Sequence, residues 1–466
     1  MAERRRADAW IWALAALTAA GAALRFSTLS VQSFWLDEAV THQLVTRTFG
    51  SMLSAIPHSE STPPLYYVLA WVWVRVFSAG EVGLRSLSAL IGTATIVLLA
   101  LIARRLGGRR AGLAAAALCA TNPLLIWYSQ EARAYALVVA FCALSLWCLL
   151  REDWRGFALA SGLALATHYF AVFIVVPELA WVCWRHARGS RPAAWSAAFV
   201  VAVAAALMPL AVAQAGGNRA SFISASGLAG RIVAVPKQFL IGYATPHQAI
   251  LTAVAAVLAV ALGFWLARAD RGLVALAAFA VGVPVAMALV GLDYLITRNL
   301  IAAMVPLVAL AGIAAARSPA GPALVAALCA VGVIAYGGVE GNRFYQRDDW
   351  RDAAAALGPA TRGPRVIVVN PSDGVPALDI YLPVHELPKG LPETTREIDV
   401  IDLAHDPPAI GTPFDIEGFT FCAPPVQTPE YDIVRYCAPM PLSEIYTVLE
   451  RTRLIYPPEA AILGNG

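Results

Sequence analysis

Long apolar runs recur through the first 338 residues of the sequence and constrain its fold more than any other feature. A helix needs about 20 apolar residues to cross the hydrocarbon core of a bilayer. The run at 157–184 is too long for one crossing and carries His168 and Tyr169 near its centre, so we divide it into two helices. The predicted spans are 9–26, 86–103, 111–127, 134–150, 157–167, 171–184, 195–213, 250–267, 273–290, 300–316 and 322–338. We therefore predict a polytopic α-helical membrane protein with about 11 transmembrane helices.

The composition supports a membrane protein and excludes other classes. Hydrophobic residues make up 59% of the 466 residues and charged residues 14%, whereas soluble globular proteins are nearer half apolar and a quarter charged. So little charge also argues against a disordered chain and against a nucleic-acid partner. The formal net charge of +3 hides two unlike parts, because 1–338 holds 24 Lys and Arg against 12 Asp and Glu, and 339–466 holds 10 against 19. We predict a basic membrane domain at 1–338 and an acidic domain at 339–466.

Arginines give the expected orientation in the membrane. They cluster in alternate short loops, at 4–6, 104–110, 151–155, 185–191, 268–271 and 317. Cytoplasmic loops are the ones enriched in Lys and Arg, so we predict a cytoplasmic N-terminus and an extracytoplasmic acidic domain. The first apolar run lacks a small-residue cleavage site, so we expect it to be retained as a helix.

The first outer loop, at about 28–85, opens with an acidic pair. Asp37 and Glu38 follow Trp35 and Leu36 shortly after the first span. Such a pair could supply a general base, or it could start an interfacial helix with Asp37 as the N-cap, and the residues alone leave both open. The loop continues with an apolar stretch at 64–77. Counting that stretch as a full span would place 104–110 outside, so we predict a helix at the membrane interface.

The later outer loops present further polar side chains to the same side. Glu131, Arg133 and Tyr135 lie at the mouth of a span, where charged groups usually face a cavity. An internal salt bridge is the structural alternative. His168 lies at the next outer turn, where a packing role is commoner than a catalytic one. Arg298 lies at the last outer turn, where it could meet an anionic headgroup or extend to lipid phosphate.

Five segments in this order resemble a known family. They are Trp35-Leu36-Asp37-Glu38-Ala39, the Thr-Pro-Pro-Leu-Tyr-Tyr of 62–67, and the stretches 128–135, 167–170 and 345–354. They are similar to segments of bacterial members of the protein O-mannosyltransferase and aminoarabinose-transferase superfamily, which are membrane glycosyltransferases of the GT-C fold (family 39). The resemblance spans roughly the whole chain. It implies a GT-C membrane domain and an outward C-terminal domain in the bacterial inner membrane.

The resemblance also implies a reaction. The family moves a sugar, usually with inversion, from a polyprenyl monophosphate carrier to a lipid, glycan or protein acceptor on the outer face of the membrane. Its first-loop acidic pair carries the catalytic base, which by position is Asp37, with Glu38 beside it. The leaving phosphate needs nearby positive charge, which Arg133 and Arg298 could supply. Further candidates for substrate binding are Glu131, Tyr135, His168 and Tyr66. The acidic pair could hold a divalent ion, but this branch of the superfamily generally needs none, so we expect no cofactor.

The sequence departs from the family at one place. The aminoarabinose transferases carry a Lys just before the proline bend, where it contacts the donor phosphate. Here that stretch reads Ser59-Glu60-Ser61-Thr62, and the lysines of the chain are Lys237 and Lys389. The phosphate site must therefore differ, and Lys237, in a long outer loop, could substitute.

A transporter or flippase for a lipid-linked sugar is the alternative function. Transporters place ionisable groups near the bilayer midplane, often in inverted repeats. The predicted spans are almost free of acidic residues, Glu178 being the clear exception, and no repeat is evident. The enzyme is therefore the favoured hypothesis.

The acidic domain has the pattern of a small α/β domain. Predicted helices at 349–357 and 374–382 alternate with predicted strands at 365–369 and 397–403. Cys422 and Cys437 are the cysteines outside the membrane domain, and an oxidising exterior favours a disulfide between them. The other five cysteines lie in apolar spans without metal-ligand spacing, so we predict no metal site.

Overall fold

The computed structural model describes residues 2–185, 189–216, 222–223, 226–266, 270–360, 365–370, 372–386, 394–403, 416, 418–442 and 461–465. Its contacts divide the chain into a helical body, formed by 1–29 and 44–341, and a C-terminal unit, formed by 30–43 and 342–466. The predicted boundary after residue 338 lies close to this division. The two assignments differ at 30–43, which we had placed in the membrane domain and which packs with the C-terminal unit. Predicted residues such as Arg188 and Arg268 lie outside the described parts.

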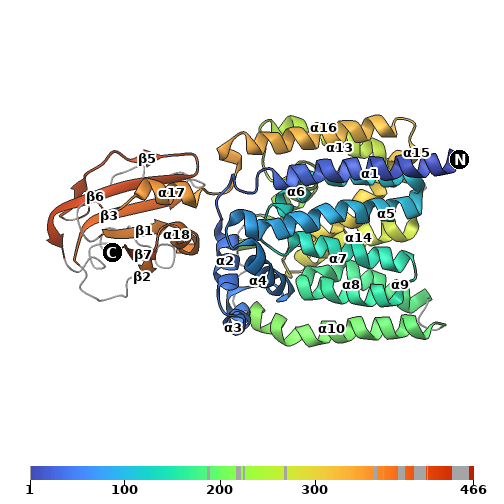
Figure 1. Cartoon of the computed structure of the whole chain (residues 1–466), viewed down its shortest axis with the longest axis horizontal. Helices are drawn as coiled ribbons and strands as arrows, with labels where there is room; N and C mark the ends of the chain where they lie inside the picture. The colour runs from blue at the N-terminus through green and yellow to red at the C-terminus, as the bar shows by residue number, and fades with distance from the viewer. Residues whose placement is uncertain are drawn as a thin grey trace. The chain divides into compact units, whose positions relative to one another are not determined.

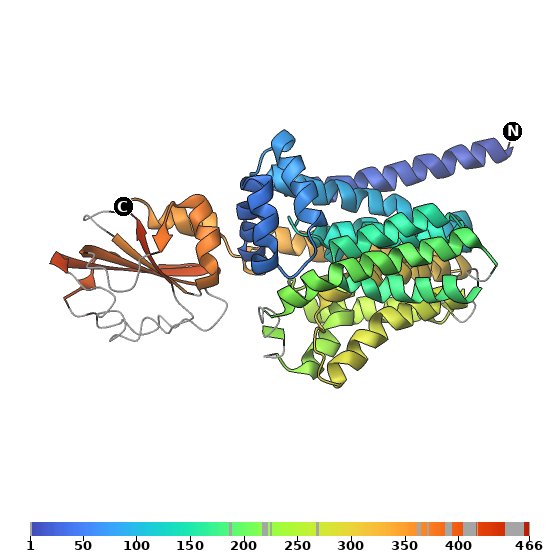
Figure 2. The ribbon, with the colours of Figure 1, turned by 90° about the horizontal axis from the view of Figure 1, so that it is seen from below.

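Most helices of the helical body follow the predicted spans, but α12 lies in the stretch between 213 and 250 that we predicted to be an outer loop. Figure 1 shows α1, α5, α7, α10 and α16 running roughly side by side, and Figure 2 shows the same bundle from below. The helices are α1 (Ala2–Phe26), α5 (Glu81–Thr121), α6 (Pro123–Ser129), α7 (Tyr135–Leu150), α8 (Trp154–Thr167), α9 (Val172–Arg185), α10 (Arg191–Ala215), α12 (Leu228–Ile241), α13 (Gln248–Gly263), α14 (Arg271–Leu289), α15 (Met304–Arg317) and α16 (Gly321–Glu340). Among the described residues, 6 helices are long and apolar enough to cross a membrane. The polytopic helical class is confirmed, and the count of about 11 stays a prediction.

Two predicted breaks are present in the structure. α5 is two helices joined at Gly108, whose φ of 84° is readily adopted only by glycine. A Cβ added to Gly112 would lie 2.7 Å from the carbonyl oxygen of Ala100, so the second half packs back against the first. At His168 the backbone is extended, and this residue ends α8 before α9 begins. The division at His168 is therefore confirmed, and the break predicted at 104–110 is present as a kink at Gly108, with helix on both sides of it rather than a loop.

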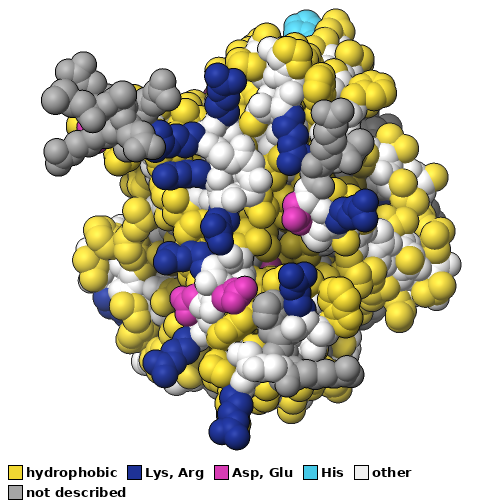
Figure 3. Space-filling view, turned by 90° about the vertical axis from the view of Figure 1, so that its right-hand side faces the viewer, with side chains coloured by type: hydrophobic (Ala, Val, Ile, Leu, Met, Phe, Trp, Pro, Cys, Tyr) yellow, Lys and Arg dark blue, Asp and Glu magenta, His cyan; other side chains and the backbone are white. Residues whose placement is uncertain are grey.

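One end of the helical body is rich in positive charge. Figure 3 looks onto the end at which the N-terminus lies and shows many Lys and Arg side chains there among apolar ones. Exposed arginines flank the breaks between helices, at Arg104, Arg105, Arg109, Arg110, Arg151, Arg155, Arg185, Arg191, Arg271 and Arg317. This distribution matches the alternation in the sequence, from which we predict that this end faces the cytoplasm.

Two short helices lie at the other end of the body, α3 (Phe49–Ser59) and α4 (Leu65–Phe77) (Figure 1). α4 exposes Val72, Val76 and Phe77, which are at least half accessible. The Arg75 guanidinium carbon lies 3.4 Å from the centre of the Trp71 ring. An apolar surface with an aromatic–arginine pair suits contact with lipid at a membrane interface.

A fully buried cation joins three helices at this end of the body. Arg25, at the end of α1, donates to the carbonyl oxygens of Cys119 (2.9 Å) and Ala120 (3.0 Å) and to Ser129 Oγ (3.1 Å). Those carbonyls belong to the last turn of α5, where unsatisfied acceptors carry partial negative charge. Gly92 leaves the space, since a Cβ there would lie 2.0 Å from Ser129 Oγ. Arg25 thus fixes α1 against α5 and α6.

The C-terminal unit is a small mixed sheet covered by helices. The strand order is β2 (His385–Glu386), β7 (Ala461–Asn465), β1 (Arg365–Asn370), β3 (Thr395–Leu403), β6 (Tyr431–Leu442) and β4 (Thr420–Phe421), with β5 (Val426–Gln427) also paired to β6. β1 and β3 run parallel, and the chain between them forms α18 (Val375–Tyr381). α17 (Trp350–Leu357) and α18 pack on one face over Ile367 and Ile401. The α/β class and all four predicted elements are confirmed.

The segment 30–43 is part of this unit through its backbone as well as its side chains. Ser33 Oγ accepts a hydrogen bond from the Trp350 backbone N–H at 3.0 Å, at the start of α17. The Phe34 N–H donates to the Tyr381 hydroxyl at 2.8 Å, at the end of α18. The segment 30–43 is therefore hydrogen-bonded to both α17 and α18, more than 300 residues away in the sequence.

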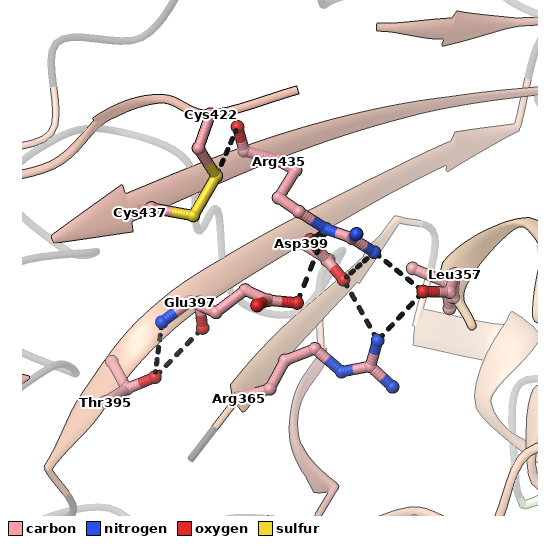
Figure 4. Close-up of polar contacts among 8 residues, drawn as sticks. All are labelled: Leu357, Arg365, Thr395, Glu397, Asp399, Cys422, Arg435 and Cys437. Atoms are coloured by element: carbon pink, nitrogen blue, oxygen red, sulfur yellow. Dashed lines mark hydrogen bonds and ion pairs between the residues drawn. A yellow bond between two sulfur atoms is a disulfide. The ribbon is translucent and has the colours of Figure 1, made fainter. Parts of the chain in front are cut away.

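A buried ion cluster continues the apolar core on the same sheet face (Figure 4). Asp399 on β3 accepts from Arg435 on β6, at 2.7 and 3.0 Å, and from Arg365 on β1, at 3.2 Å. Both arginines also donate to the Leu357 carbonyl oxygen at the end of α17, at 2.6 and 3.1 Å. Asp399 and Arg365 have no exposed side-chain surface. The cluster links three strands to one helix, and Asp399 is its centre.

We predict that Asp399→Asn destabilises the protein by about 3–5 kcal/mol, because the fully buried guanidinium group of Arg365 loses its ion pair with Asp399. Arg435 keeps its second ion pair, with Glu397 at 3.4 Å. Arg343→Ala is the matched control. It removes an ion pair with Asp352 in which the side chains are 60% and 44% exposed, so its effect should stay below about 1 kcal/mol. Denaturant unfolding in micelles measures both, and equal effects would contradict the central role of Asp399.

The structure contains the Cys422–Cys437 disulfide, with the two Cα atoms 5.6 Å apart. It joins β6 to the residue after β4, next to Arg435 (Figure 4). We predict that a membrane-impermeant maleimide added to intact spheroplasts labels these two cysteines only after reduction, because disulfide sulfur does not react with it. Labelling without reduction would contradict the disulfide in the cell, and labelling only after the membrane is opened would contradict the extracytoplasmic placement.

Candidate active site

The predicted site residues fall in both units, and each group is described by itself. Asp37 and Glu38 belong to the C-terminal unit, whereas the other candidates belong to the helical body.

Asp37 lies in the first turn of α2 (Leu36–Thr46) as its second residue, so the alternative that it is an N-cap is wrong. The Ala39 N–H donates to the Trp35 carbonyl at 2.9 Å, so the helix turn already includes the acidic pair. Asp37 is partly exposed, whereas Glu38 has no exposed surface. Of the two carboxylates, Asp37 is therefore the one that solvent or a substrate can reach.

In the helical body, Arg133 forms a two-pronged ion pair with Glu60. The Nη1–Oε1 and Nη2–Oε2 distances are both 2.9 Å, and the side chains are 10% and 2% exposed. Parallel hydrogen bonds of this kind are the strongest way for a carboxylate to bind arginine. Glu60 was absent from the predicted site, although it stands in the stretch before the proline bend. The salt bridge that we weighed for Arg133 is thus present, with Glu60 as the partner.

Polar contacts hold the loop around this ion pair. The Tyr67 ring centre lies 5.9 Å from the Arg133 guanidinium carbon, and the Tyr67 hydroxyl lies 3.0 Å from Thr62 Oγ1. Gln214, at the end of α10, donates to the Thr62 carbonyl oxygen at 3.1 Å and accepts from the Tyr169 hydroxyl at 2.7 Å. Hydrogen bonds through Gln214 therefore connect the loop after α3 to the end of α10 and to the turn between α8 and α9.

Tyr66, the predicted candidate in this loop, points elsewhere. Its hydroxyl lies 3.4 Å from Ser88 Oγ on α5, and the side chain is fully buried. Its neighbour Tyr67 is the tyrosine beside Arg133.

His168 is a buried, neutral side chain. Burial and the nearby charges of Arg133 and Arg298 lower its pKa to about 3, far below the ordinary value near 6.5. Its Nδ1 accepts from the Phe170 N–H at 3.3 Å. At neutral pH the ring therefore carries no positive charge, and it contacts the rings of Tyr135 and Phe170.

A row of aromatic rings leads from His168 towards α12. The ring centre of Tyr135 is 5.7 Å from that of His168 and 4.5 Å from that of Tyr128. The hydroxyls of Tyr128 and Tyr243 are hydrogen-bonded to each other. Lys237 on α12 donates to the Tyr243 carbonyl oxygen. Lys237, which we had placed in a loop, is therefore on a helix and at the end of this row.

Arg298 belongs to the same region. It lies in the 3-10 helix η3 (Thr297–Ala303), with its guanidinium carbon 5.3 Å from the Phe222 ring centre. Its charge lowers the pKa of His168 and opposes the burial that raises the pKa of Tyr243. The negative charge of Glu131 raises the pKa of Tyr243. The Glu131 side chain is almost fully buried. The structure thus gathers Glu131, Arg133, Tyr135, His168 and Arg298 from separate loops into one cluster.

The helical body also contains an apolar cavity of about 340 Å³. It is lined by residues of α5, α6, α12, α13, α15 and α16, among them Pro123, Pro236, Phe239, Leu240 and Met304. Gly242, next to Tyr243, touches one wall, since a Cβ there would lie 3.3 Å from Pro123 Cβ. Such a cavity suits a hydrocarbon chain. Within the described parts of the chain, no group of three or more His, Cys, Asp or Glu is arranged to hold a metal ion.

Comparison with known proteins shows which proteins this architecture is similar to. Residues 61–213 match the family model described as dolichyl-phosphate-mannose-protein mannosyltransferase. No curated protein matches the sequence. The crystal structure of ArnT from Cupriavidus metallidurans in the apo state superposes with a TM-score of 0.60 at 14% identity, covering 92% of this chain and 98% of that one. The same protein bound to undecaprenyl phosphate gives a TM-score of 0.53 with the same identity and coverage.

The chain has the GT-C fold. The resemblance seen in the five sequence segments is thereby confirmed at the level of fold. The match covers nearly all of both chains, so it includes the region of the C-terminal unit as well as the GT-C helical body. The matched family segment runs from the proline bend to the end of α10 and contains Arg133 and His168.

The sequence analysis did not identify several residues that contact the polar cluster around Arg133 and His168. Gln214 is a single polar residue at the end of an apolar run, a signal that could have marked it as buried and paired. Glu60 stands among polar residues, so no such signal marks it. Tyr128 and Tyr243 come together only through the packing of α6 against α12, which no local pattern predicts.

We predict that Glu60→Gln destabilises the protein by about 3 kcal/mol, because the buried Arg133 charge loses its counter-charge. The double variant Glu60→Gln, Arg133→Met should recover part of the loss, since no uncompensated charge remains. Thermal unfolding in micelles measures the three proteins. Additive losses in the double variant would show that the pair is not coupled.

Proposed function

We propose that this protein is an inverting glycosyltransferase that moves a sugar from a polyprenyl monophosphate donor to a lipid, glycan or protein acceptor on the outer face of the bacterial inner membrane. The observation that carries the proposal is the GT-C fold along nearly the whole chain, together with the mannosyltransferase family match. The related ArnT structure with undecaprenyl phosphate supports the class of donor. Membrane lipids surround the apolar helices.

In the proposed reaction, Asp37 is the general base. An acceptor hydroxyl gives its proton to the Asp37 carboxylate as its oxygen bonds to the anomeric carbon. The bond from that carbon to the phosphate oxygen breaks on the opposite face, and polyprenyl monophosphate leaves with the electron pair. Phosphate is a good leaving group, so the proposal needs no second acid and no resident cofactor. The partial exposure of Asp37 and the full burial of Glu38 favour Asp37 for this role.

The helical body offers what the donor requires. Its apolar cavity can hold part of a polyprenyl chain, and its polar cluster holds the cations Arg133 and Arg298. The charge of Arg133 is already matched by Glu60. This pair therefore suits contact with sugar hydroxyls, which hydrogen-bond to both of its members, better than it suits binding of a phosphate.

The transporter alternative is less well supported. Its best evidence in the sequence is Glu178, an acidic residue within a predicted span. In the structure, Glu178 Oε2 accepts from Ser145 Oγ at 2.5 Å, and Ser145 lies 2.8 Å from Ser161 Oγ. These contacts join α7, α8 and α9 and give Glu178 a packing role.

Mass spectrometry of lipids that co-purify with the protein tests the class of substrate. We expect a polyprenyl phosphate or its sugar conjugate, and the conjugate then serves as donor in a transfer assay with reconstituted protein. Transport of the conjugate across vesicles without transfer would favour the flippase instead.

With that donor, we predict that Asp37→Asn lowers the rate of sugar transfer at least about 100-fold, because removal of a general base typically costs this much. Asp8→Asn, an exposed residue of α1, is the control and should retain full activity. Near-normal transfer by folded Asp37→Asn protein would rule out Asp37 as the base.

A further inference from the structure

Lys237 is a cation whose surroundings leave its charge uncompensated. Its ammonium group is half-buried and donates to a neutral carbonyl oxygen, that of Tyr243. Among the described residues, no carboxylate forms an ion pair with it. Burial lowers the pKa of Lys237, as expected for an ammonium group that loses water without gaining an anion. An anionic ligand would compensate the unfavourable desolvation of the ammonium group.

Lys237 lies on α12 among residues that line the apolar cavity, although it is not itself a lining residue. Pro236, Phe239 and Leu240 all line that cavity. Each residue of a helix turns about 100° from the last, so Lys237 lies about 60° around α12 from Leu240. The loop that Lys237 binds also reaches the cavity, because Gly242 touches Pro123. Lys237 and three residues that line the cavity therefore lie on the same helix, α12, and the loop that Lys237 binds also approaches the cavity wall at Pro123.

Other groups at this place also suit a phosphate. The Tyr128 and Tyr243 hydroxyls meet beside the loop that Lys237 holds, and phenol groups can donate to phosphate oxygens. Arg298 acts electrostatically on Tyr243. In contrast, Arg133 is matched by Glu60 at 2.9 Å. Lys237 is thus the better-placed cation for a group whose tail occupies the cavity.

We propose that Lys237 binds the phosphate of the polyprenyl donor, whose chain begins in the cavity lined by Pro236, Phe239 and Leu240. This inference rests on the proposed function and names the residue that recognises its donor. A molecule with an anionic head and an apolar chain satisfies the ammonium group and the cavity together. The ammonium–phosphate contact holds the leaving group, so Lys237 stabilises the charge that develops on it.

The test compares two lipids that differ only in the phosphate. Undecaprenyl phosphate and undecaprenol are added separately to the purified full-length protein in micelles, and native mass spectrometry gives the bound fractions. Lys237→Met should weaken binding of undecaprenyl phosphate about 10-fold or more and leave binding of undecaprenol within about twofold. Lys237→Arg should keep most of the preference for the phosphate, since it retains the charge.

Arg317→Met, at the exposed end of α15, is the control for a lost positive charge and should bind as the wild type. If Lys237→Met binds undecaprenyl phosphate as well as the wild type, the assignment of Lys237 is overturned. Equal loss of both lipids also overturns it, because Lys237 would then act only by holding the Tyr243 loop. If the wild-type protein binds undecaprenyl phosphate no better than undecaprenol, the proposed function fails at its donor, whatever the variants do.

Discussion

Charge inside an apolar helical body has to be compensated by the protein, because packed side chains and hydrocarbon solvate ions poorly. The structure meets this constraint in several ways. Arg25 is surrounded by carbonyl oxygens at the end of α5. Arg133 has the carboxylate of Glu60, and Arg231 on α12 has that of Asp293, with N–O distances of 2.5 and 2.7 Å. Each solution joins segments that are distant in the sequence, so compensation of charge also determines which helix ends meet.

This constraint explains why the candidate site differs from the one expected. From the sequence, Arg133 could either bind a phosphate or form an internal salt bridge, and its partner Glu60 could not be recognised because it lies 73 residues earlier in another loop. In the structure, that partner turns Arg133 into half of a neutral pair, while Lys237 keeps a net charge. This contrast is the reason for which we propose Lys237 on α12, rather than Arg133, as the residue that binds the anion. A missing lysine at the proline bend is consistent with this proposal.

The parts of the fold that could be predicted are those in which local pattern and tertiary structure agree. Apolar runs predicted the helices of the membrane domain, and arginine clusters supported the breaks at Gly108 and His168. Alternating helix and strand patterns in the acidic domain predicted β1, β3, α17 and α18. The long strand β6 was missed, because its polar residues Arg435 and Asp432 hide a buried strand. Those residues pair with partners on β3, and no local pattern indicates a partner. The same reason applies to Glu60, whose role depends on a contact across the fold.

The packing of residues 30–43 with the C-terminal unit has a consequence for synthesis of the protein. The segment that carries Asp37 leaves the ribosome before Trp350 and Tyr381, which bind it and lie 317 and 347 residues further along the chain. The two partners are separated by the whole helical body in the order of translation. A nascent or truncated chain can insert its helices and still lack the surface on which its acidic segment is ordered. Completion of the chain, rather than insertion of the bundle, then becomes the event that assembles the proposed base.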